Sequence, residues 1–188
     1  MVLHKEKLHL KPFGGSGFAA HLVSPLLRVA LGDDGPQSFV TVMVDIDNMT
    51  VQNGCLRICP GPSTTGPHYD VIEPERDGNP DAAGRAGAIP KETADSLDFE
   101  DVLCVGGGVA VFGGWAPHRS AANQSAFPRW AVFLTYNPRR EGAVHDWYYQ
   151  RMEDIRNKWS VKVGRMPPSQ TPSASPEEIE ALSAIPRI

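Results

Sequence analysis

Two of the six histidines, His21 and His118, lie in surroundings that suggest chemistry. His21 ends a glycine-rich segment, and His118 lies in the run Trp-Ala-Pro-His-Arg-Ser. An imidazole can ligate a metal ion or transfer a proton near neutral pH. A single histidine in a strand-rich chain is more often a hydrogen-bonded polar residue, so each has to be judged with its neighbours.

Arg129 stands at the head of a predicted strand, eleven residues after His118. Side chains alternate between the two faces of a strand, so Arg129 shares a face with Ala131, Phe133 and Thr135. A guanidinium on this largely apolar face needs an anion. The anion is either a neighbouring Asp or Glu, or the carboxylate of a ligand held by two parallel hydrogen bonds.

These residues have to be positioned by short strands. Five segments are rich in β-branched or aromatic residues and are separated by Asn-Gly, Pro-Gly, Gly-Gly and Asn-Pro turns. They are residues 38–46, 55–59, 101–105, 109–112 and 130–136. The chain has 18 glycines and 17 prolines among its 188 residues, which also favours many short elements over long helices. The pattern predicts a mainly β sandwich or barrel.

One longer helix is predicted toward the C-terminus, over residues 146–159, where apolar residues recur at helical spacing. We expect a single domain over residues 1–160 and a flexible tail over residues 161–188, with a short helix beginning near Ser175. Residues 60–97 are rich in Pro, Gly, Asp and Ala and are expected to form a long loop.

Composition and charge exclude several classes of partner. Eighteen basic and twenty-two acidic residues give a net charge of -4, without the basic stripe that nucleic acid would need. No stretch approaches the roughly 20 apolar residues of a membrane span, and the charged N-terminus does not resemble a secretory signal. The glycine clusters fit neither a dinucleotide fingerprint nor a phosphate loop. A soluble, cytoplasmic protein is expected.

The three cysteines, Cys55, Cys59 and Cys104, are an odd and sparse set, as expected of reduced thiols. On an extended strand Cys55 and Cys59 would lie roughly 13 Å apart, at ~3.3 Å per residue. This separation excludes a disulfide between them. We expect buried, reduced cysteines that pack as small apolar residues.

Five segments, in their order and spacing, resemble the phytanoyl-CoA dioxygenase superfamily of non-haem iron(II), 2-oxoglutarate-dependent oxygenases. They are KPFGGSGFAAH at residues 11–21, NGCLRICPG at 53–61, WAPHRSAAN at 115–123, FLTYNP at 133–138 and HDWYY at 145–149. The resemblance implies a double-stranded β-helix, that is, a cupin-like jelly roll, here with a C-terminal helix. It also implies Fe(II) and 2-oxoglutarate as cofactors.

The resemblance assigns roles to individual residues. His21 and His118 match the two histidine ligands of the iron. Arg129 matches the residue that grips the far carboxylate of 2-oxoglutarate, and Ser120 matches a secondary contact to the same molecule. Trp115 and Phe133 are expected to line the pocket.

The chain departs from the family pattern at the third metal ligand. The family motif His-any-Asp reads His21-Leu22-Val23 here, and valine has no donor atom. Some halogenating relatives have a small residue at this position and bind chloride instead, but the branched side chain of Val23 would fill that space. Four aspartates are alternative third ligands: Asp33, Asp34, Asp45 and Asp47. The chain also begins close to the glycine-rich segment, so it looks short at its front.

The sequence is compatible with two functions. The first is an iron(II)/2-oxoglutarate-dependent dioxygenase that oxidises a small organic molecule in secondary metabolism. The second is a catalytically impaired jelly-roll binding or partner protein that keeps the pocket but has lost the carboxylate ligand. A third reading, a remnant lacking its N-terminal helices, predicts an exposed apolar sheet face that a homodimer could cover.

Overall fold

The computed structural model describes residues 1–32, 35–61 and 87–162. The chain divides into two compact units, Met1–Tyr148 and Tyr149–Ile188. The candidate site lies in the first unit. Most of the predicted long loop, at residues 62–86, and the predicted helix near Ser175 lie outside the described residues.

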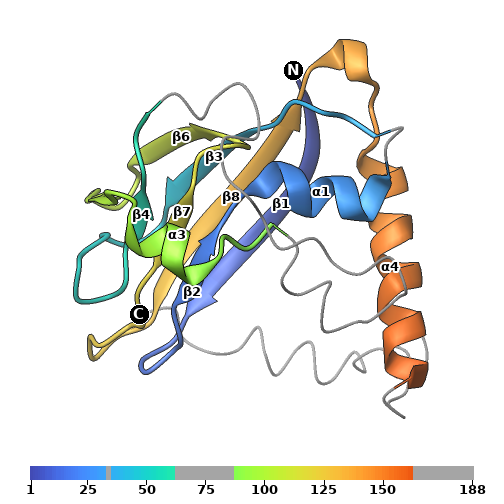
Figure 1. Ribbon diagram of the computed structural model, residues 1–188. Coiled ribbons are helices and arrows are strands. Elements are labelled where there is room, and N and C mark those ends of the chain that lie inside the picture. The colour runs from blue at the N-terminus through green and yellow to red at the C-terminus, as the bar shows by residue number, and fades with distance from the viewer. Residues whose placement is uncertain (33–34, 62–86, 163–188) are drawn as a thin grey trace. The chain divides into compact units, whose positions relative to one another are not determined.

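The first sheet has four antiparallel strands in the order β1-β8-β3-β6 (Figure 1). They are β1 (Val2–Lys11), β8 (Arg129–Asn137), β3 (Val40–Asp45) and β6 (Val109–Gly113). The last three coincide with predicted strands. β1 is a strand that the sequence pattern did not predict, because the charged run Lys5-Glu6-Lys7 interrupts its apolar residues and resembles a solvent-exposed segment.

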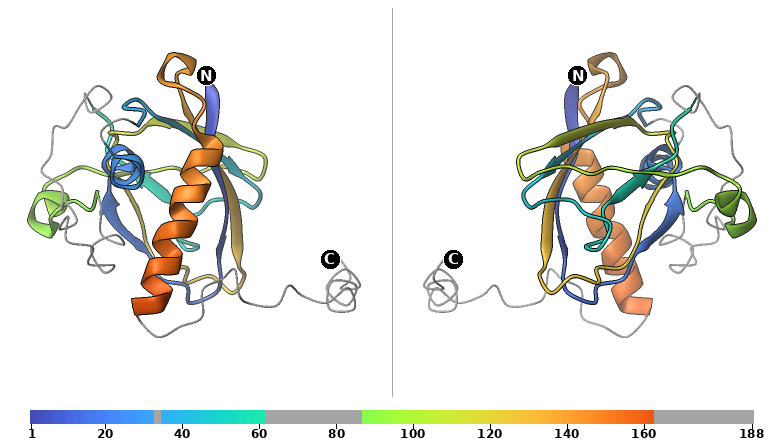
Figure 2. Two further views of the ribbon diagram at one scale, coloured as in Figure 1. Left: turned by 90° about the vertical axis from the view of Figure 1, so that its right-hand side faces the viewer. Right: turned by 90° about the vertical axis from the view of Figure 1, so that its left-hand side faces the viewer.

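The second sheet is built from four short strands in the order β2-β7-β4-β5. They are β2 (Phe18–His21), β7 (His118–Ser120), β4 (Leu56–Ile58) and β5 (Glu100–Asp101). β2 and β7 were not predicted, since four and three residues are too few to show a strand period. The two sheets face each other (Figure 2), and the predicted jelly roll is confirmed.

The buried faces of the sheets form the core. Along β3 every second residue is buried, as expected for a strand with one face inward. Met43, Phe112 and Ala131 from the first sheet pack with Leu56 from the second and with α1 (Val23–Leu31). The space between the sheets is therefore filled by side chains, except where the cavity described below opens.

Four helical segments complete the described chain: α1, α3 (Lys91–Asp95), the 3-10 helix η1 (Arg139–Glu141) and α4 (His145–Lys162). α4 confirms the helix predicted over residues 146–159. α3 corrects the prediction that residues 60–97 are loop throughout. None of the helices in the described part of the chain is long and apolar enough to cross a membrane.

Two of the three cysteines are buried as predicted, and Cys104 is half-buried. Cys55, Cys59 and Cys104 carry free thiols, and the first two are buried. Cys55 and Cys59 flank β4 at its two ends and belong to different clusters of the core. Each packs as a small apolar side chain there.

Candidate active site

Strands β2 and β7 bring the two candidate histidines together. His21, the last residue of β2, is the register partner of His118, the first residue of β7. The centroids of the two imidazole rings lie 4.1 Å apart. Residues 97 positions apart in the sequence thus meet because two short strands pair, and both side chains line one cavity.

Backbone carbonyls fix the tautomer of both rings. The Nδ1 atom of His21 lies 2.8 Å from the Ala19 carbonyl oxygen, and that of His118 lies 2.9 Å from the Ala116 carbonyl oxygen. A carbonyl oxygen can only accept, so Nδ1 carries the proton in each ring and Nε2 keeps its lone pair. This is the arrangement that prepares a histidine to ligate a metal.

Burial keeps both imidazoles neutral. The pKa of His118 is lowered to about 3, first by burial and then by the proximity of His21. The pKa of His21 is also lowered, again mainly by burial. Because only a neutral imidazole binds metal, the two rings are in the required form throughout the neutral pH range.

The cavity between the sheets has a volume of about 300 Å³. Five of the residues singled out in the sequence line it: His21, His118, Arg129, Ser120 and Phe133. Ser120 lies in β7 two residues after His118, so an extended backbone places both side chains on the same face. One cavity therefore holds the residues to which the family resemblance gave roles.

Arg129 is buried, with only 2% of its surface exposed. Its Nη2 donates to the Gly54 carbonyl oxygen at 2.9 Å, and its Nε donates to the Asn53 carbonyl oxygen at 3.4 Å. Within the described residues no carboxylate forms an ion pair with it. Burial lowers the pKa of Arg129, although the charge of Asp45 opposes this. The remaining N–H groups are available to an anionic ligand.

Lys11 is a site residue that the sequence analysis missed. It ends β1 as the register partner of Arg129 and is 2% exposed. Its Nζ donates to Ser120 Oγ at 2.8 Å, to the Gly54 carbonyl oxygen at 3.2 Å and to the Ala121 carbonyl oxygen. Burial and the nearby Arg129 lower the pKa of Lys11 to about 8. Because Ser120 Oγ accepts from Lys11, its own proton is free to donate to a ligand.

The third position of the metal motif faces the cavity but offers no donor. Val23 is the first residue of α1, is 7% exposed and lines the cavity. Among the residues that the structure describes, no group of three His, Cys, Asp or Glu side chains could hold a metal ion. The described residues therefore fit iron in part: they supply two neutral nitrogen donors and lack the carboxylate.

The alternative carboxylates do not fill this role in the described part of the chain. Asp33 and Asp34 lie outside it. Asp45 is buried in the first sheet, where burial raises its pKa, and it does not line the cavity. Asp47 accepts a hydrogen bond from the Trp130 backbone N–H at 2.8 Å, which is a structural role at the end of β3.

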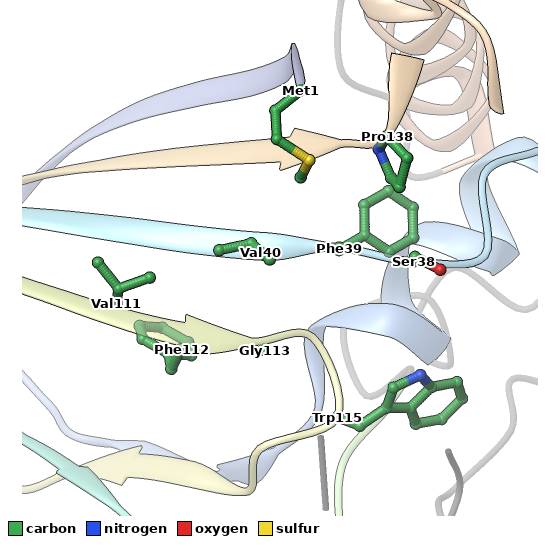
Figure 3. Close-up of a pocket in the computed structure, with 9 residues that line it drawn as sticks. All are labelled: Met1, Ser38, Phe39, Val40, Val111, Phe112, Gly113, Trp115 and Pro138. Carbon is green, nitrogen blue, oxygen red and sulfur yellow. The ribbon is translucent and has the colours of Figure 1, made fainter. Parts of the chain in front are cut away.

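The expectation that Trp115 lines this pocket is wrong. Trp115 lines a different cavity of about 450 Å³ near one end of β3 and β6 (Figure 3). Among the described residues, the side chains that line that cavity are mainly apolar and none is acidic or basic. An aromatic residue in a short loop can turn to either cavity, and its type alone does not decide between them.

Comparison with known proteins agrees with this geometry. The family model described as phytanoyl-CoA dioxygenase (PhyH) matches residues 3–131. The chain belongs to this family. The match includes His21, His118 and Arg129 and ends within β8, so the PhyH assignment rests on most of the part of the chain that forms the cavity.

Two curated relatives of this PhyH-family chain act on phosphonates by name. The chain is 33% identical over 149 residues to a methylphosphonate hydroxylase of Gimesia maris, covering 79% of this chain and 50% of that protein. It is 33% identical over 165 residues to a 2-aminoethylphosphonate dioxygenase of an uncultured bacterium, HF130_AEPn_1, covering 88% and 55%. The chain thus spans about half the length of these relatives.

Solved structures share the PhyH-family fold at low sequence identity. The epimerase SnoN, in complex with Fe3+, alpha ketoglutarate and nogalamycin RO, has a TM-score of 0.53 at 19% identity, over 72% of this chain and 49% of that one. EctD from S. alaskensis, with 2-oxoglutarate and 5-hydroxyectoine, has a TM-score of 0.53 at 23% identity, over 74% and 45%. These likenesses establish the jelly-roll fold of the chain.

Proposed function

We propose that the chain carries the site of an iron(II)- and 2-oxoglutarate-dependent oxygenase that oxidises a small organic molecule. The observation that carries the proposal is the content of one cavity. It contains two neutral imidazoles with free Nε2 lone pairs and a buried guanidinium with unused donors. Such a set suits a ferrous ion and a dicarboxylic acid in the same space.

Each residue has a role in this proposal. His21 and His118 would hold the iron through Nε2, and Arg129 would pair with the far carboxylate of 2-oxoglutarate. Ser120 would donate its hydroxyl proton to that carboxylate, because Lys11 already occupies a lone pair of its Oγ. Bound iron supplies the oxidising chemistry, in which 2-oxoglutarate and dioxygen become succinate and carbon dioxide while the substrate is oxidised.

The relatives suggest the substrate, and the sequence suggests the setting. Because two relatives are named for phosphonates, we propose a small phosphonate as the first substrate to test, in secondary metabolism. The domain comprises residues 1–160, works in the cytoplasm and needs no nucleic acid.

A homodimer is proposed because the edge strand β6 exposes Val109 and Val111 by 55% and 63%.

Anaerobic titration with ferrous iron, with and without 2-oxoglutarate, tests the metal centre. The proposal predicts stoichiometric iron binding at micromolar concentrations and a visible charge-transfer band when 2-oxoglutarate is added. Admission of air should then produce succinate. His118→Ala should abolish the band, whereas the exposed Arg140→Ala should keep it. Absence of iron binding in the wild-type chain would refute the proposal.

A second candidate function is favoured by Val23. A cavity that keeps the imidazoles and Arg129 but lacks the carboxylate suits a binding or partner protein without redox activity. Val23→Asp discriminates, because position 23 faces the cavity and a carboxylate there begins a helix, where it is electrostatically favoured. If the chain is such a binding protein, Val23→Asp should create tight iron binding that the wild type lacks, and the uncharged Val23→Asn should not. Equal iron affinity in all three proteins would exclude this function.

A further inference from the structure

The cavity wall formed by β1 is cationic. The register of β1 against β8 shifts between Leu3 and Lys5, and from Lys5 onward every second side chain turns to the same face. Lys5, Lys7 and His9 line the cavity. With Arg119 and Arg129 the two lysines make its charge positive, since no Asp or Glu is found among its described lining residues. His9 adds no charge near neutral pH, because burial lowers its pKa to about 4. The wall carries more positive charge than one dicarboxylic acid would need.

The cations form two groups along β8. Lys11 and Arg129 are register partners at one end, whereas Lys5 is the partner of Thr135, six residues further along β8. At ~3.3 Å per residue the two positions are roughly 20 Å apart along the strand. Neither Lys5 nor Lys7 forms an ion pair with a carboxylate of the described residues. An anionic ligand held at Arg129 therefore does not neutralise the charges of Lys5 and Lys7 at the other end of the cavity, which we call the Lys5 end.

Hydroxyl groups complete the Lys5 end. Thr135 pairs with Lys5 on one side and with Thr41 on the other, so the three residues form one row across three strands. The Thr41 and Thr135 hydroxyl oxygens lie 3.2 Å apart, and both residues line the cavity. One hydroxyl donates to the other, which leaves one hydroxyl proton for a ligand. Lys5 is half-buried, and its Nζ lies 5.9 Å from the centroid of the Tyr148 ring. Burial and the neighbouring Lys7 lower the pKa of Lys5 to about 8.

This row lies beside the histidines. Thr41 is the register partner of Phe112, whose ring centroid lies 5.0 Å from that of His118. Lys5 and Thr41 line the same cavity as both imidazoles. An anion bound at Lys5 would thus place the rest of its molecule next to His21 and His118.

We infer that Lys5 and Lys7, with the hydroxyls of Thr41 and Thr135, form a second anion subsite that holds the tetrahedral oxyanion headgroup of the substrate. The inference rests on the proposed function, because it makes Arg129 the partner of the cosubstrate. Lysine ammonium groups act as point charges that suit the several oxygens of a phosphonate, whereas a planar carboxylate is better matched by an arginine fork. The subsite would orient a small phosphonate with its carbon toward the imidazoles.

Phosphorus NMR titration of methylphosphonate at pH 7, with 2-oxoglutarate saturating, tests this subsite without any turnover. Wild-type protein should bind methylphosphonate, and both Lys5→Met and Lys7→Met should weaken binding by about fivefold or more. Lys5→Arg should restore part of the affinity. Lys91→Met removes an equal charge at an exposed helix position and should leave binding unchanged. A thermal transition measured for each variant confirms that it is folded.

The comparison ligands decide what the subsite recognises. Methylphosphonate should bind more tightly than acetate and at least as tightly as inorganic phosphate. Preference for acetate, stronger binding of phosphate than of methylphosphonate, or competition with 2-oxoglutarate would overturn the inference. If iron and 2-oxoglutarate bind but methylphosphonate does not, the subsite alone fails. If methylphosphonate binds through Lys5 and Lys7 but iron does not bind, only the proposed oxygenase function fails.

Discussion

At the scale of single residues, Arg129 determines how the cosubstrate is held. Its guanidinium is buried and bonded only to backbone carbonyls in the described chain, so it can form a charge-assisted pair with a carboxylate in a water-poor site. Such a hydrogen bond contributes about 1.5–3 kcal/mol. We therefore expect Arg129→Met to weaken 2-oxoglutarate binding by about tenfold to a hundredfold.

Calorimetric titration of 2-oxoglutarate measures this effect. Arg129→Lys should recover only part of the loss, because an ammonium cannot form two parallel bonds to a carboxylate. Arg140→Met, at an exposed position, is the control and should bind as the wild type does. An Arg129→Met protein that is folded and binds 2-oxoglutarate with unchanged affinity would show that the guanidinium serves the fold and not the ligand.

The residue types predicted part of the site and missed another part. His21, His118, Arg129 and Ser120 could be named because their motifs are distinctive, and the structure places all four on one cavity. Lys11 could not be named, since a lysine at the end of an alternating segment is usually solvent-exposed. Its burial depends on Gly54, Ser120 and Ala121, whose positions follow only from the pairing of distant strands.

At the scale of elements, the turn before β4 connects the two buried cations to the backbone. The Gly54 carbonyl oxygen accepts hydrogen bonds from both Lys11 and Arg129, and Gly54 has a φ of +70°. A Cβ atom at this position would lie 2.3 Å from the Ala121 carbonyl oxygen. Only glycine can therefore hold this carbonyl in place.

We expect Gly54→Ala to lower the free energy of unfolding by about 1–3 kcal/mol and to weaken 2-oxoglutarate binding, because the carbonyl must move. Urea unfolding and calorimetry measure the two effects. Gly14→Ala is a matched control, since Gly14 has a φ of +68° with nothing within 4 Å of the added Cβ. It should show the backbone strain without the loss of ligand affinity. Equal effects of the two substitutions on 2-oxoglutarate binding would contradict the role of Gly54.

The elements themselves were predicted unevenly. β3, β6 and β8 have at least five residues each and are rich in β-branched or aromatic residues, so they could be predicted from the sequence. β1 was not recognised because its inward face carries Lys5, Lys7 and Lys11, which a strand exposed to solvent would also show. Charged residues that line a cavity look like surface residues until the partner strand is known.

At the scale of the whole molecule, buried histidines make folding sensitive to acid. The pKa of His4 is lowered to about 4 by burial, and its ring lies between Phe39 and Tyr148. The pKa values of His9 and His118 are lowered to about 4 and about 3. Below pH 6.5 these histidines become protonated in the unfolded chain but stay neutral in the folded chain. The free energy of unfolding therefore falls as the pH falls.

His4→Leu should flatten this decline between pH 6.5 and pH 4 by on the order of 1.4 kcal/mol per pH unit. His145 gives a control of opposite sign, because Asp146 and Glu6 raise its pKa and its stabilising effect is lost as the pH rises. His145→Leu should therefore steepen the decline on acidification. Urea unfolding at half-unit pH steps measures both slopes, and an unchanged slope in His4→Leu would refute the assignment.

The most direct test of the shared cavity is the coupling between iron and 2-oxoglutarate. Anaerobic calorimetry of 2-oxoglutarate binding, with and without ferrous iron, should show that iron tightens binding by about tenfold or more, and the reverse titration should give the same factor. The double variant His21→Ala/His118→Ala should keep the metal-independent affinity and lose the coupling. Wild-type protein in which each ligand binds with an affinity independent of the other would contradict a common site for the two histidines and Arg129.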